Sequence, residues 1–203
     1  LNATLAITLV LGLGISMLSW ATDGWRFWTT ESLRRHALVE SARSLPHVPV
    51  ETNEGQSSFL SDYEQPVLIV DFIYTSCPTR CVAMGSSFYQ IQQSVEKLGH
   101  DNNVQLLSIT FDPKIDDPRA LSAYLKRHTN NVSNWDAIRI SEESDLSRIL
   151  DDFGVVVLPD PIFGYIHNSA IYVFHNGKVV EIFDYDQPNS VISKIRTLFE
   201  SNA

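Results

Sequence analysis

Apolar residues dominate the first part of the chain without interruption. The run from Leu1 to Ala21 has no charged residue and is rich in Leu, Ile, Val, Ala and Gly. About 20 apolar residues are enough to cross a bilayer as a helix, so we expect a transmembrane anchor over residues 1–22. The alternative is a cleaved signal peptide, because Ser19-Trp20-Ala21 fits a small-x-small site. Aromatic residues typical of a membrane–water interface follow at Trp20, Trp25, Phe27 and Trp28.

A short segment with helical periodicity follows the anchor. Thr29 or Thr30 is a suitable N-cap for a helix from Glu31 to about Ser44. We expect residues 23–44 to form a linker helix that joins the anchor to one globular domain at residues 45–203. That domain is long enough for a full hydrophobic core, since 44% of the 203 residues are hydrophobic.

Two buried strands with a helix between them are the clearest pattern in the domain. Val67 to Ile73 is an almost unbroken apolar, β-branched run, typical of a strand buried on both faces. Val104 to Phe111 repeats the pattern, so we expect a second strand parallel to the first and next to it. Apolar residues at helical spacing predict a connecting helix: Val82, Met84, Phe88, Ile91, Val95 and Leu98.

Turn residues place the strands at both ends of the domain. Prolines bias the segment from Leu45 to Pro49 toward an extended conformation. Asn53-Glu54-Gly55 is expected to turn between two short edge strands. Asn176-Gly177, between apolar runs at 170–174 and 178–183, is a strong signal for a β-hairpin.

The remaining elements complete an α/β order. We expect helices at 118–128 and 189–199, a short strand at 137–140, and a helix that is capped by Ser141 and ends near Gly154. A loop is expected over Pro159–Ile166. Strand-helix-strand, then hairpin, then helix is the order of a thioredoxin-like fold, which has a central mixed sheet flanked by helices.

Cys77 and Cys81 are the only cysteines of the chain, and they lie where the first buried strand gives way to the helix. If the helix begins near Pro78, the two side chains face the same way, about 5–6 Å apart at Cβ. Such thiols can close a disulfide or bind one soft metal ion, and a helix N-terminus lowers a thiol pKa. Two small buried apolar residues are the alternative interpretation. A single pair without a wider framework favours redox or metal chemistry over scaffolding.

Charge argues against one class of partner. The formal net charge is −9, and no basic stripe is present to neutralise phosphates, so nucleic acid is not expected as a partner. An acidic surface suits a basic protein partner or simply solubility.

The chain has six histidines, which are the candidates for a third ligand to a metal held by Cys77 and Cys81. His175 falls at the predicted hairpin tip, away from the cysteine end of the sheet. His167 follows the loop Pro159–Ile166 and precedes a strand, and the residues alone describe it as an ordinary histidine at a strand start. The other four are expected to be solvated or to cap helices: His36, His47, His100 and His128.

Three segments match one pattern in order and distance. The first is Phe72-Ile-Tyr-Thr-Ser-Cys77-Pro-Thr-Arg-Cys81; the second is Ser108 to Pro113, continued by Asp117-Pro118 and Leu121 to Tyr124; the third is His167-Asn-Ser-Ala-Ile-Tyr-Val-Phe. Together these segments resemble the SCO/SenC family, and the resemblance spans about Leu45 to Phe199. These are thioredoxin-fold copper proteins that help to assemble cytochrome c oxidase.

The resemblance implies that Cys77, Cys81 and His167 bind copper, as Cu(I), Cu(II) or both. It also implies a membrane-anchored metallochaperone, rather than an enzyme, that delivers copper to the dinuclear copper site of cytochrome c oxidase. Its partners would be the copper-site subunit of the oxidase and other copper carriers or thiol oxidoreductases. The alternative is a thiol-disulfide reductase, with Cys77 and Cys81 as its redox-active pair, that keeps the copper-site cysteines of the oxidase reduced.

Orientation in the membrane is predicted differently by the charges and by the resemblance. Four arginines follow the apolar run, which by itself favours a cytoplasmic domain. The resemblance implies a single-pass protein of the inner (cytoplasmic) membrane with its globular domain in the periplasm. The alternative is the mitochondrial inner membrane, with the domain facing the intermembrane space.

Two residues depart from the pattern of many family members. Val82 stands where a proline often follows the second cysteine, and Ile166 where an acidic residue often precedes the histidine. Valine continues a helix, so the first change is expected to matter little. The second removes a negative charge beside His167, which is expected to weaken Cu(II) binding or to alter the pKa of the histidine.

Overall fold

The computed structural model describes residues 2–22, 24, 29–77, 80–162 and 164–200, with the backbone alone for Arg80 and Cys81. The chain divides into two compact units, Leu1–Glu40 and Ser41–Ala203. The division into an anchor, a linker helix and a domain at 22 and 44 stays a prediction.

Two helices make up the described part of the first unit. Within the described residues, α1 (Ala3–Ala21) is the one helix long and apolar enough to cross a membrane, with a mean hydropathy of 1.8. α2 (Thr30–Glu40) begins after Thr29, whose hydroxyl accepts a 3.1 Å hydrogen bond from the Ser32 N–H, as an N-cap does. It ends before the predicted Ser44. The expected interfacial residues Trp25, Phe27 and Trp28 lie outside the described residues.

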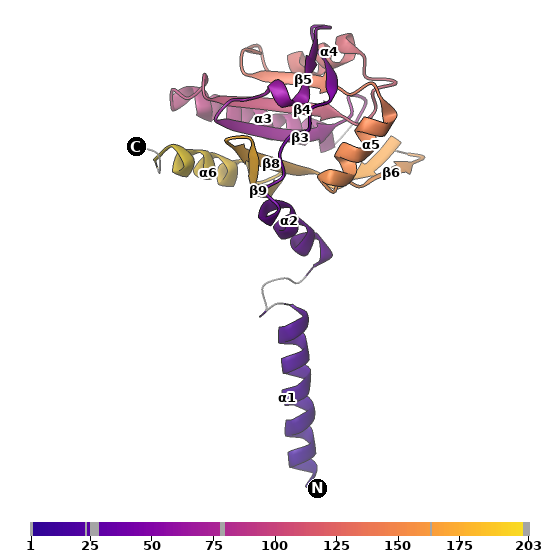
Figure 1. Ribbon diagram of the computed structural model, residues 1–203, viewed down its shortest axis with the longest axis vertical. Coiled ribbons are helices and arrows are strands. Elements are labelled where there is room, and N and C mark those ends of the chain that lie inside the picture. The colour runs from indigo at the N-terminus through magenta and orange to yellow at the C-terminus, as the bar shows by residue number, and fades with distance from the viewer. Residues whose placement is uncertain (1, 23, 25–28, 78–79, 163, 201–203) are drawn as a thin grey trace. The chain divides into compact units, whose positions relative to one another are not determined.

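A seven-stranded mixed sheet forms the centre of the second unit (Figure 1). β3, β4 and β5 run parallel to one another. β8 pairs antiparallel with β3, and β9 pairs antiparallel with β8. All residues of β3 and β4 are buried, as their apolar runs predict. The strands lie in the order β2 (Ser57–Phe59), β1 (Pro49–Thr52), β5 (Trp135–Arg139), β4 (Val104–Thr110), β3 (Val67–Ile73), β8 (Ala170–His175) and β9 (Lys178–Asp184).

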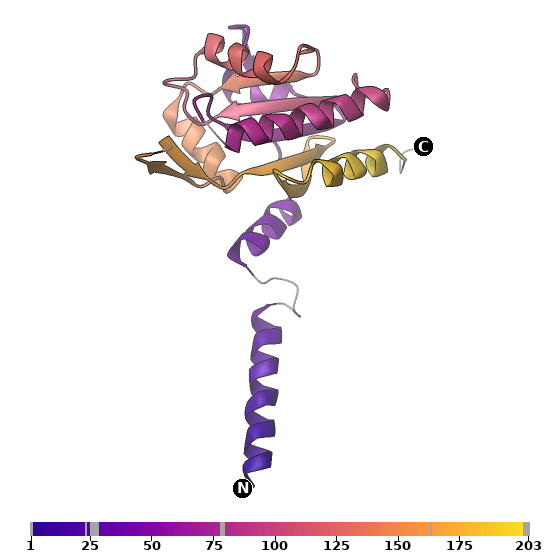
Figure 2. The same cartoon turned by 180° about the vertical axis from the view of Figure 1, so that it is seen from behind.

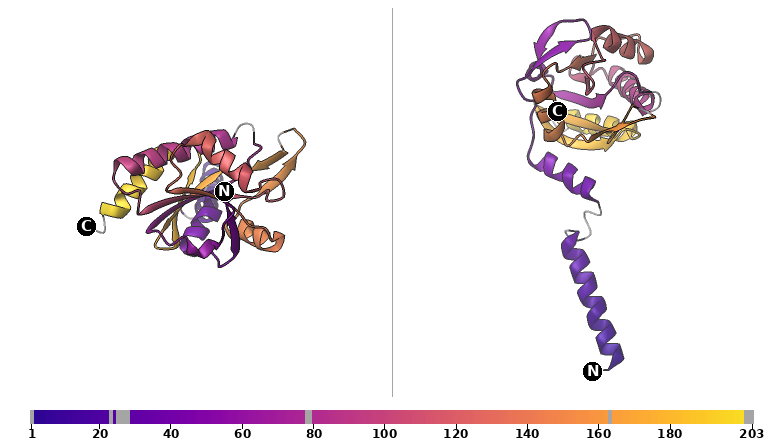
Figure 3. Two further views of the ribbon diagram at one scale, coloured as in Figure 1. Left: turned by 90° about the horizontal axis from the view of Figure 1, so that it is seen from above. Right: turned by 90° about the vertical axis from the view of Figure 1, so that its right-hand side faces the viewer.

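Helices cover both faces of this sheet (Figures 2 and 3). On one face, Phe88 and Tyr124 pack their rings against Trp135 of β5. On the other face, Phe153 contacts Phe72 and Tyr172. The first face carries α3 (Arg80–Lys97), α4 (Pro118–His128) and α6 (Pro188–Glu200), and the second carries α5 (Glu143–Asp152); a 3-10 turn, η1 (Leu60–Asp62), precedes β3.

Capping and turn chemistry account for two further predictions that are confirmed, α4 and the β8–β9 hairpin. α4 spans the predicted residues because the Asp117 carboxylate accepts a 2.8 Å hydrogen bond from the Ala120 N–H and Pro118 occupies the first turn. The β8–β9 hairpin turns through Asn176 and Gly177, with φ of +50° and +76°. Both angles lie in the left-handed region that a two-residue hairpin turn requires.

Two further predictions, on the cap of α5 and on the place of β1 in the sheet, are wrong. α5 begins at Glu143 with Glu142 as its N-cap, so Ser141 does not cap it. β1 is not an edge strand, because β5 pairs with it on the side away from β2. The helix after β3 is described from Arg80 onward, and Pro78, its expected start, lies outside the described residues.

The expected loop over Pro159–Ile166 is instead a two-stranded sheet. β6 (Val157–Asp160) pairs antiparallel with β7 (Gly164–His167), separately from the main sheet. Proline is confined to edge strands because it donates no ladder hydrogen bond. A two-stranded sheet consists of edge strands alone, so it accommodates Pro159.

Candidate functional site

The cysteine loop leaves the carboxyl end of β3, where binding sites of α/β sheets usually form. Cys77 lies in this loop and is 6% exposed, and its N–H donates a 3.4 Å hydrogen bond to the Tyr74 carbonyl. Cys81 is the second residue of α3, and its side chain lies outside the described part of the structure. One cysteine therefore precedes the helix, and the other lies in its first turn, at the positive end of the helix dipole.

A buried carboxylate fixes the start of this loop. Asp116 is fully buried and accepts hydrogen bonds from the Thr75 N–H at 3.0 Å and from the Thr75 hydroxyl at 2.5 Å. The Thr110 hydroxyl, at the end of β4, donates to the same carboxylate. Arg127 Nη2 donates to the Thr75 carbonyl at 2.9 Å. Thr75, two residues before Cys77, is thus held through its N–H, its hydroxyl and its carbonyl.

The predicted histidine lies at the same end of the sheet. His167 ends β7 and is 4% exposed. Its ring packs edge to face against Phe111, with centroids 4.9 Å apart, and against Tyr74, with centroids 6.2 Å apart. Tyr74 directly follows β3 and lies three residues before Cys77. The structure therefore brings His167 to the beginning of the cysteine loop.

The β6–β7 hairpin has two different faces. Tyr165, on the same face as His167, packs its ring against Tyr74 with centroids 5.3 Å apart. Leu158 and Ile166 are cross-strand partners, and their side chains are 57% and 51% exposed. Side chains alternate along a strand, so Ile166 points away from His167. The missing acidic residue at position 166 is therefore expected to affect a metal at His167 less than sequence adjacency suggests.

The capacity of the site to hold a metal depends on one undescribed side chain. Among the side chains that the structure describes, no group of three or more His, Cys, Asp or Glu could hold a metal ion. The predicted set includes Cys81, which lies outside that search, so the ligand set Cys77, Cys81 and His167 stays a prediction. Two sulfurs and an imidazole nitrogen form the soft donor set that suits Cu(I).

The other histidines are placed by packing or by exposed pairs. His175 pairs with Val67 at the opposite end of β3 from the cysteine loop, as predicted. His47 and His100 stack on Phe59 and Phe199, each with ring centroids 4.0 Å apart. Burial, with the Arg127 charge, lowers the pKa of His128, and His36 lies 3.5 Å from a Glu40 carboxylate oxygen.

A buried carboxyl lies within β3 itself. Asp71 is fully buried opposite Ser108 of β4, and burial raises its pKa to about 8. Ser108 Oγ accepts a 3.1 Å hydrogen bond from Trp135 Nε1. Asp71 is the single acidic residue of the run from Val67 to Ile73, and this is the sequence signal by which it could have been found.

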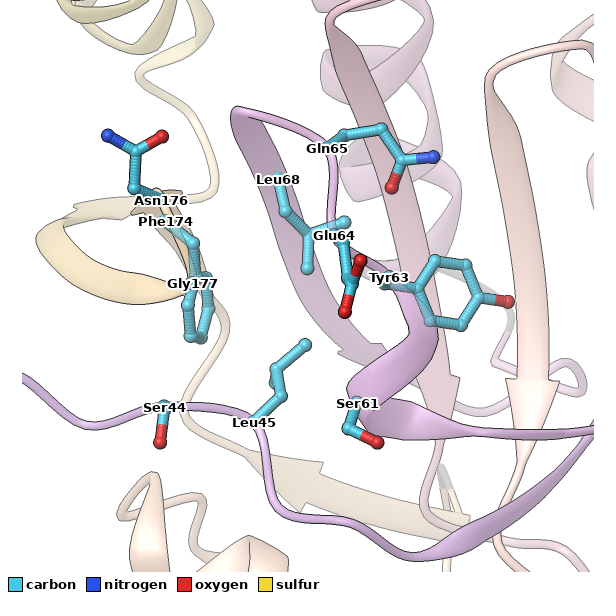
Figure 4. A pocket seen from close by; sticks show the side chains of 10 residues that line it. All are labelled: Ser44, Leu45, Ser61, Tyr63, Glu64, Gln65, Leu68, Phe174, Asn176 and Gly177. Atoms are coloured by element: carbon cyan, nitrogen blue, oxygen red, sulfur yellow. The ribbon is translucent and has the colours of Figure 1, made fainter.

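Two of the cavities lie at opposite ends of the main sheet. One, of about 400 Å³, borders the site and is lined in part by Asp112 and Tyr165. Burial and the nearby Asp116 carboxylate raise the pKa of Asp112. The other, of about 370 Å³, is lined in part by Leu68 and Phe174 (Figure 4). It lies at the start of β3 and beside the β8–β9 turn, away from the cysteine loop.

Comparison with known proteins identifies relatives over most of the second unit. The SCO1/SenC family model matches residues 50–200. A SCO1 protein homolog of Bacillus subtilis is 26% identical over 157 residues, which cover 73% of this chain and 80% of the relative.

Solved structures share the architecture. BsSco, a member of the Sco family of cytochrome c oxidase assembly proteins in which a disulfide switch was identified, matches with a TM-score of 0.66 and 22% identity, over 76% of this chain and 92% of its own. Yeast Sco1 with copper bound matches with a TM-score of 0.65 and 18% identity, over 78% and 90%. The predicted thioredoxin-like fold, a mixed sheet flanked by helices, is confirmed.

Proposed function

Because the chain belongs to the SCO1/SenC family, we propose that it is a membrane-anchored metallochaperone that delivers copper to the dinuclear copper site of cytochrome c oxidase. The observation that carries the proposal is the packing of His167 against Tyr74, three residues before Cys77. It joins the one predicted ligand that is distant in sequence to the loop that carries the first cysteine. Copper bound to yeast Sco1 is consistent with this proposal.

Cys77, Cys81 and His167 are the proposed ligands, and copper is the cargo. Thiolates bind Cu(I) as soft ligands, and an imidazole completes a three-coordinate set. Transfer requires that an incoming thiolate displace these ligands in turn, so an incomplete coordination shell is favourable. The acceptor in this proposal is the copper-site subunit of the oxidase, and other copper carriers or thiol oxidoreductases are further partners.

Copper loading tests the ligand set. Reduced full-length protein in detergent micelles, under anaerobic conditions, is expected to bind one equivalent of Cu(I). Replacement of Cys77 or Cys81 by Ser, or of His167 by Ala, is expected to abolish tight binding. His175→Ala is the matched control, since that histidine lies at the far end of β3. Unaltered copper binding by His167→Ala would show that the three-ligand site is wrong.

A membrane location with the domain in the periplasm is the proposed setting. α1 has the length and composition of a membrane span, and we assign the anchor to residues 1–22, the linker helix to 23–44 and the copper domain to 45–203. The full chain is expected to stay in the membrane fraction after carbonate extraction. Protease added to intact spheroplasts is expected to digest the domain, whereas protection of the domain would place it in the cytoplasm.

A thiol-disulfide reductase is the second candidate function. The disulfide switch identified in BsSco favours it, and the reaction would need only Cys77 and Cys81, one attacking and one resolving. His167→Ala separates the two functions, because it should leave disulfide exchange nearly intact. Absence of stoichiometric copper together with ready formation of the Cys77–Cys81 disulfide would favour the reductase.

A further inference from the structure

We infer that Asp116 and Arg127 are positioning residues for Cys77, so that α4 and the loop before it set the geometry of the cysteine pair. The inference rests on the proposed function only in taking Cys77 and Cys81 as the reactive pair. Neither residue is proposed as a ligand. Both act on Thr75, two residues before Cys77.

Asp116 holds the inner side of the loop. It accepts hydrogen bonds from the Thr75 N–H at 3.0 Å, from the Thr75 hydroxyl at 2.5 Å and from the Thr110 hydroxyl. A carboxylate accepts several hydrogen bonds at once, and charge-assisted bonds are stronger than neutral ones. Because Thr110 is the last residue of β4, this carboxylate joins the cysteine loop to the neighbouring strand.

Arg127 holds the outer side of the loop from the last turn of α4. Its guanidinium donates to the Thr75 carbonyl at 2.9 Å and lies over the Tyr124 ring, 5.7 Å from the centroid. The side chain is on the surface, so its replacement does not disturb the core. Asp116, in the loop before α4, and Arg127, in the last turn of α4, therefore bond to opposite sides of one residue.

The same helix also contacts the segment that carries Cys81. A Cβ added to Gly85, four residues after Cys81 in α3, would lie 2.3 Å from His128 Nε2. The His128 ring therefore lies directly against the backbone of α3. α4 thus contacts both flanks of the pair, the loop before Cys77 and the helix after Cys81.

The hydrogen bonds that Asp116 and Arg127 make to Thr75 are called the clamp below. Loss of the clamp is expected to release Cys77 from its buried position. Cys77 is only 6% exposed, so a loosened loop exposes the thiol and lowers its effective concentration near Cys81. Two readouts follow, both in copper-free protein. One is the rate of Cys77 alkylation by iodoacetamide in a Cys81→Ser background. The other is the reduction potential of the Cys77–Cys81 pair in glutathione redox buffers, where two thiols pass two electrons and two protons to glutathione disulfide.

The first test compares neighbouring acids in full-length protein in detergent micelles. Asp116→Asn is expected to raise the alkylation rate about tenfold, and a tenfold loss of effective concentration corresponds to a potential about 30 mV more oxidising. Asp117→Asn is the matched control, because it removes the same charge one residue away and alters only the cap of α4. Equal alkylation rates and equal potentials for the two variants would overturn the inference.

Two further pairs keep the test decisive if Asp116→Asn does not fold. Thr75→Val removes the hydroxyl donor while keeping the shape, and Thr75→Ser restores that donor. Valine is expected to shift both readouts and serine to leave them near the wild-type values. Arg127→Met is expected to shift them in the same direction, whereas Lys126→Met, on the adjacent exposed residue, is not. Arg127→Met and Lys126→Met with identical readouts would contradict the inference.

Copper is absent from these measurements, so the two proposals fail separately. Failure of the wild type to load copper would overturn the proposed metallochaperone function and would not affect the inference that Asp116 and Arg127 position Cys77. Wild-type alkylation rates and potentials in all clamp variants would overturn the clamp and leave copper binding intact.

Discussion

The Tyr74 hydroxyl donates a 3.3 Å hydrogen bond to the Tyr165 carbonyl, which joins the residue after β3 to the strand that ends in His167. The bond spans 91 residues of sequence. The Tyr74 ring also packs against the rings of Tyr165 and His167. One side chain thus connects the cysteine loop with the hairpin that carries the histidine.

Tyr74→Phe is expected to weaken this connection and keep the ring. Loss of one partly buried neutral hydrogen bond typically costs about 1 kcal/mol, and the hairpin is expected to exchange its amide hydrogens faster. Hydrogen exchange of the β7 amides measures the effect directly. Tyr89→Phe is the control, because Tyr89 is 41% exposed. Identical exchange in the two variants would contradict the connecting role of Tyr74.

Gly85→Ala is expected to destabilise the contact between α3 and α4. The new methyl would lie 2.3 Å from His128 Nε2, and overpacking costs about 1–3 kcal/mol. Urea unfolding followed by near-UV circular dichroism gives the loss of unfolding free energy. Removal of the ring in a Gly85→Ala/His128→Ala double variant is expected to restore part of it, whereas Ser86→Ala on the neighbouring exposed residue is expected to change little. A double variant with purely additive losses would contradict the steric explanation.

Asp71 is expected to make stability fall as pH rises. Its folded-state pKa of about 8 lies above the unfolded value, so between about pH 4 and pH 8 the native state holds a proton that the unfolded state releases. The contribution is fully present below about pH 4 and is lost as pH rises through 8. A pKa difference of one between the folded and unfolded states corresponds to about 1.4 kcal/mol, so the total loss is several kcal/mol at most.

Asp71→Asn checks this sign. The asparagine is expected to remove this part of the pH dependence and to make the protein more stable than wild type at pH 9. Urea unfolding at pH 5, 7 and 9 measures the difference, with the exposed Asp101→Asn as the control. The same slope of unfolding free energy against pH in wild type and Asp71→Asn would show that the carboxyl is not the source.

Ile166→Glu is expected to change Cu(II) affinity by no more than about threefold, because exposed charges are screened by solvent and salt. The side chain is 51% exposed and lies on the face of β7 opposite His167. Competitive titration against a Cu(II) chelator measures the effect at low and at moderate ionic strength. A tenfold or larger gain would show that the acidic residue of other family members acts directly on the metal.

Local patterns predicted the central sheet well. Val67 to Ile73 matched β3 at both ends, because a buried parallel strand leaves a continuous apolar run. Asp117 with Pro118 set the start of α4 through a cap that involves only nearby residues. The β6–β7 hairpin was missed because Pro159 suggests a loop, although an edge strand tolerates it.

The support of the site could not be predicted in the same way. Asp116 lies 41 residues from Thr75, and nothing local distinguishes it from Asp112 or Asp117. Its role comes from the parallel pairing of β3 and β4, which brings the ends of both strands together. His167 was assigned by family resemblance, since a histidine at a strand start has no distinctive pattern of its own.

The separate β6–β7 sheet has a consequence for the order in which ligands would leave a bound ion. Cys77 follows the central strand of a buried sheet, whereas His167 belongs to a two-stranded ribbon with an exposed outer face. Local opening occurs first where few buried contacts must break. If His167 binds copper as proposed, its imidazole would be the ligand that detaches and returns most readily, while the thiols would stay in place. A recipient would meet the ion from the histidine side, and release would begin there.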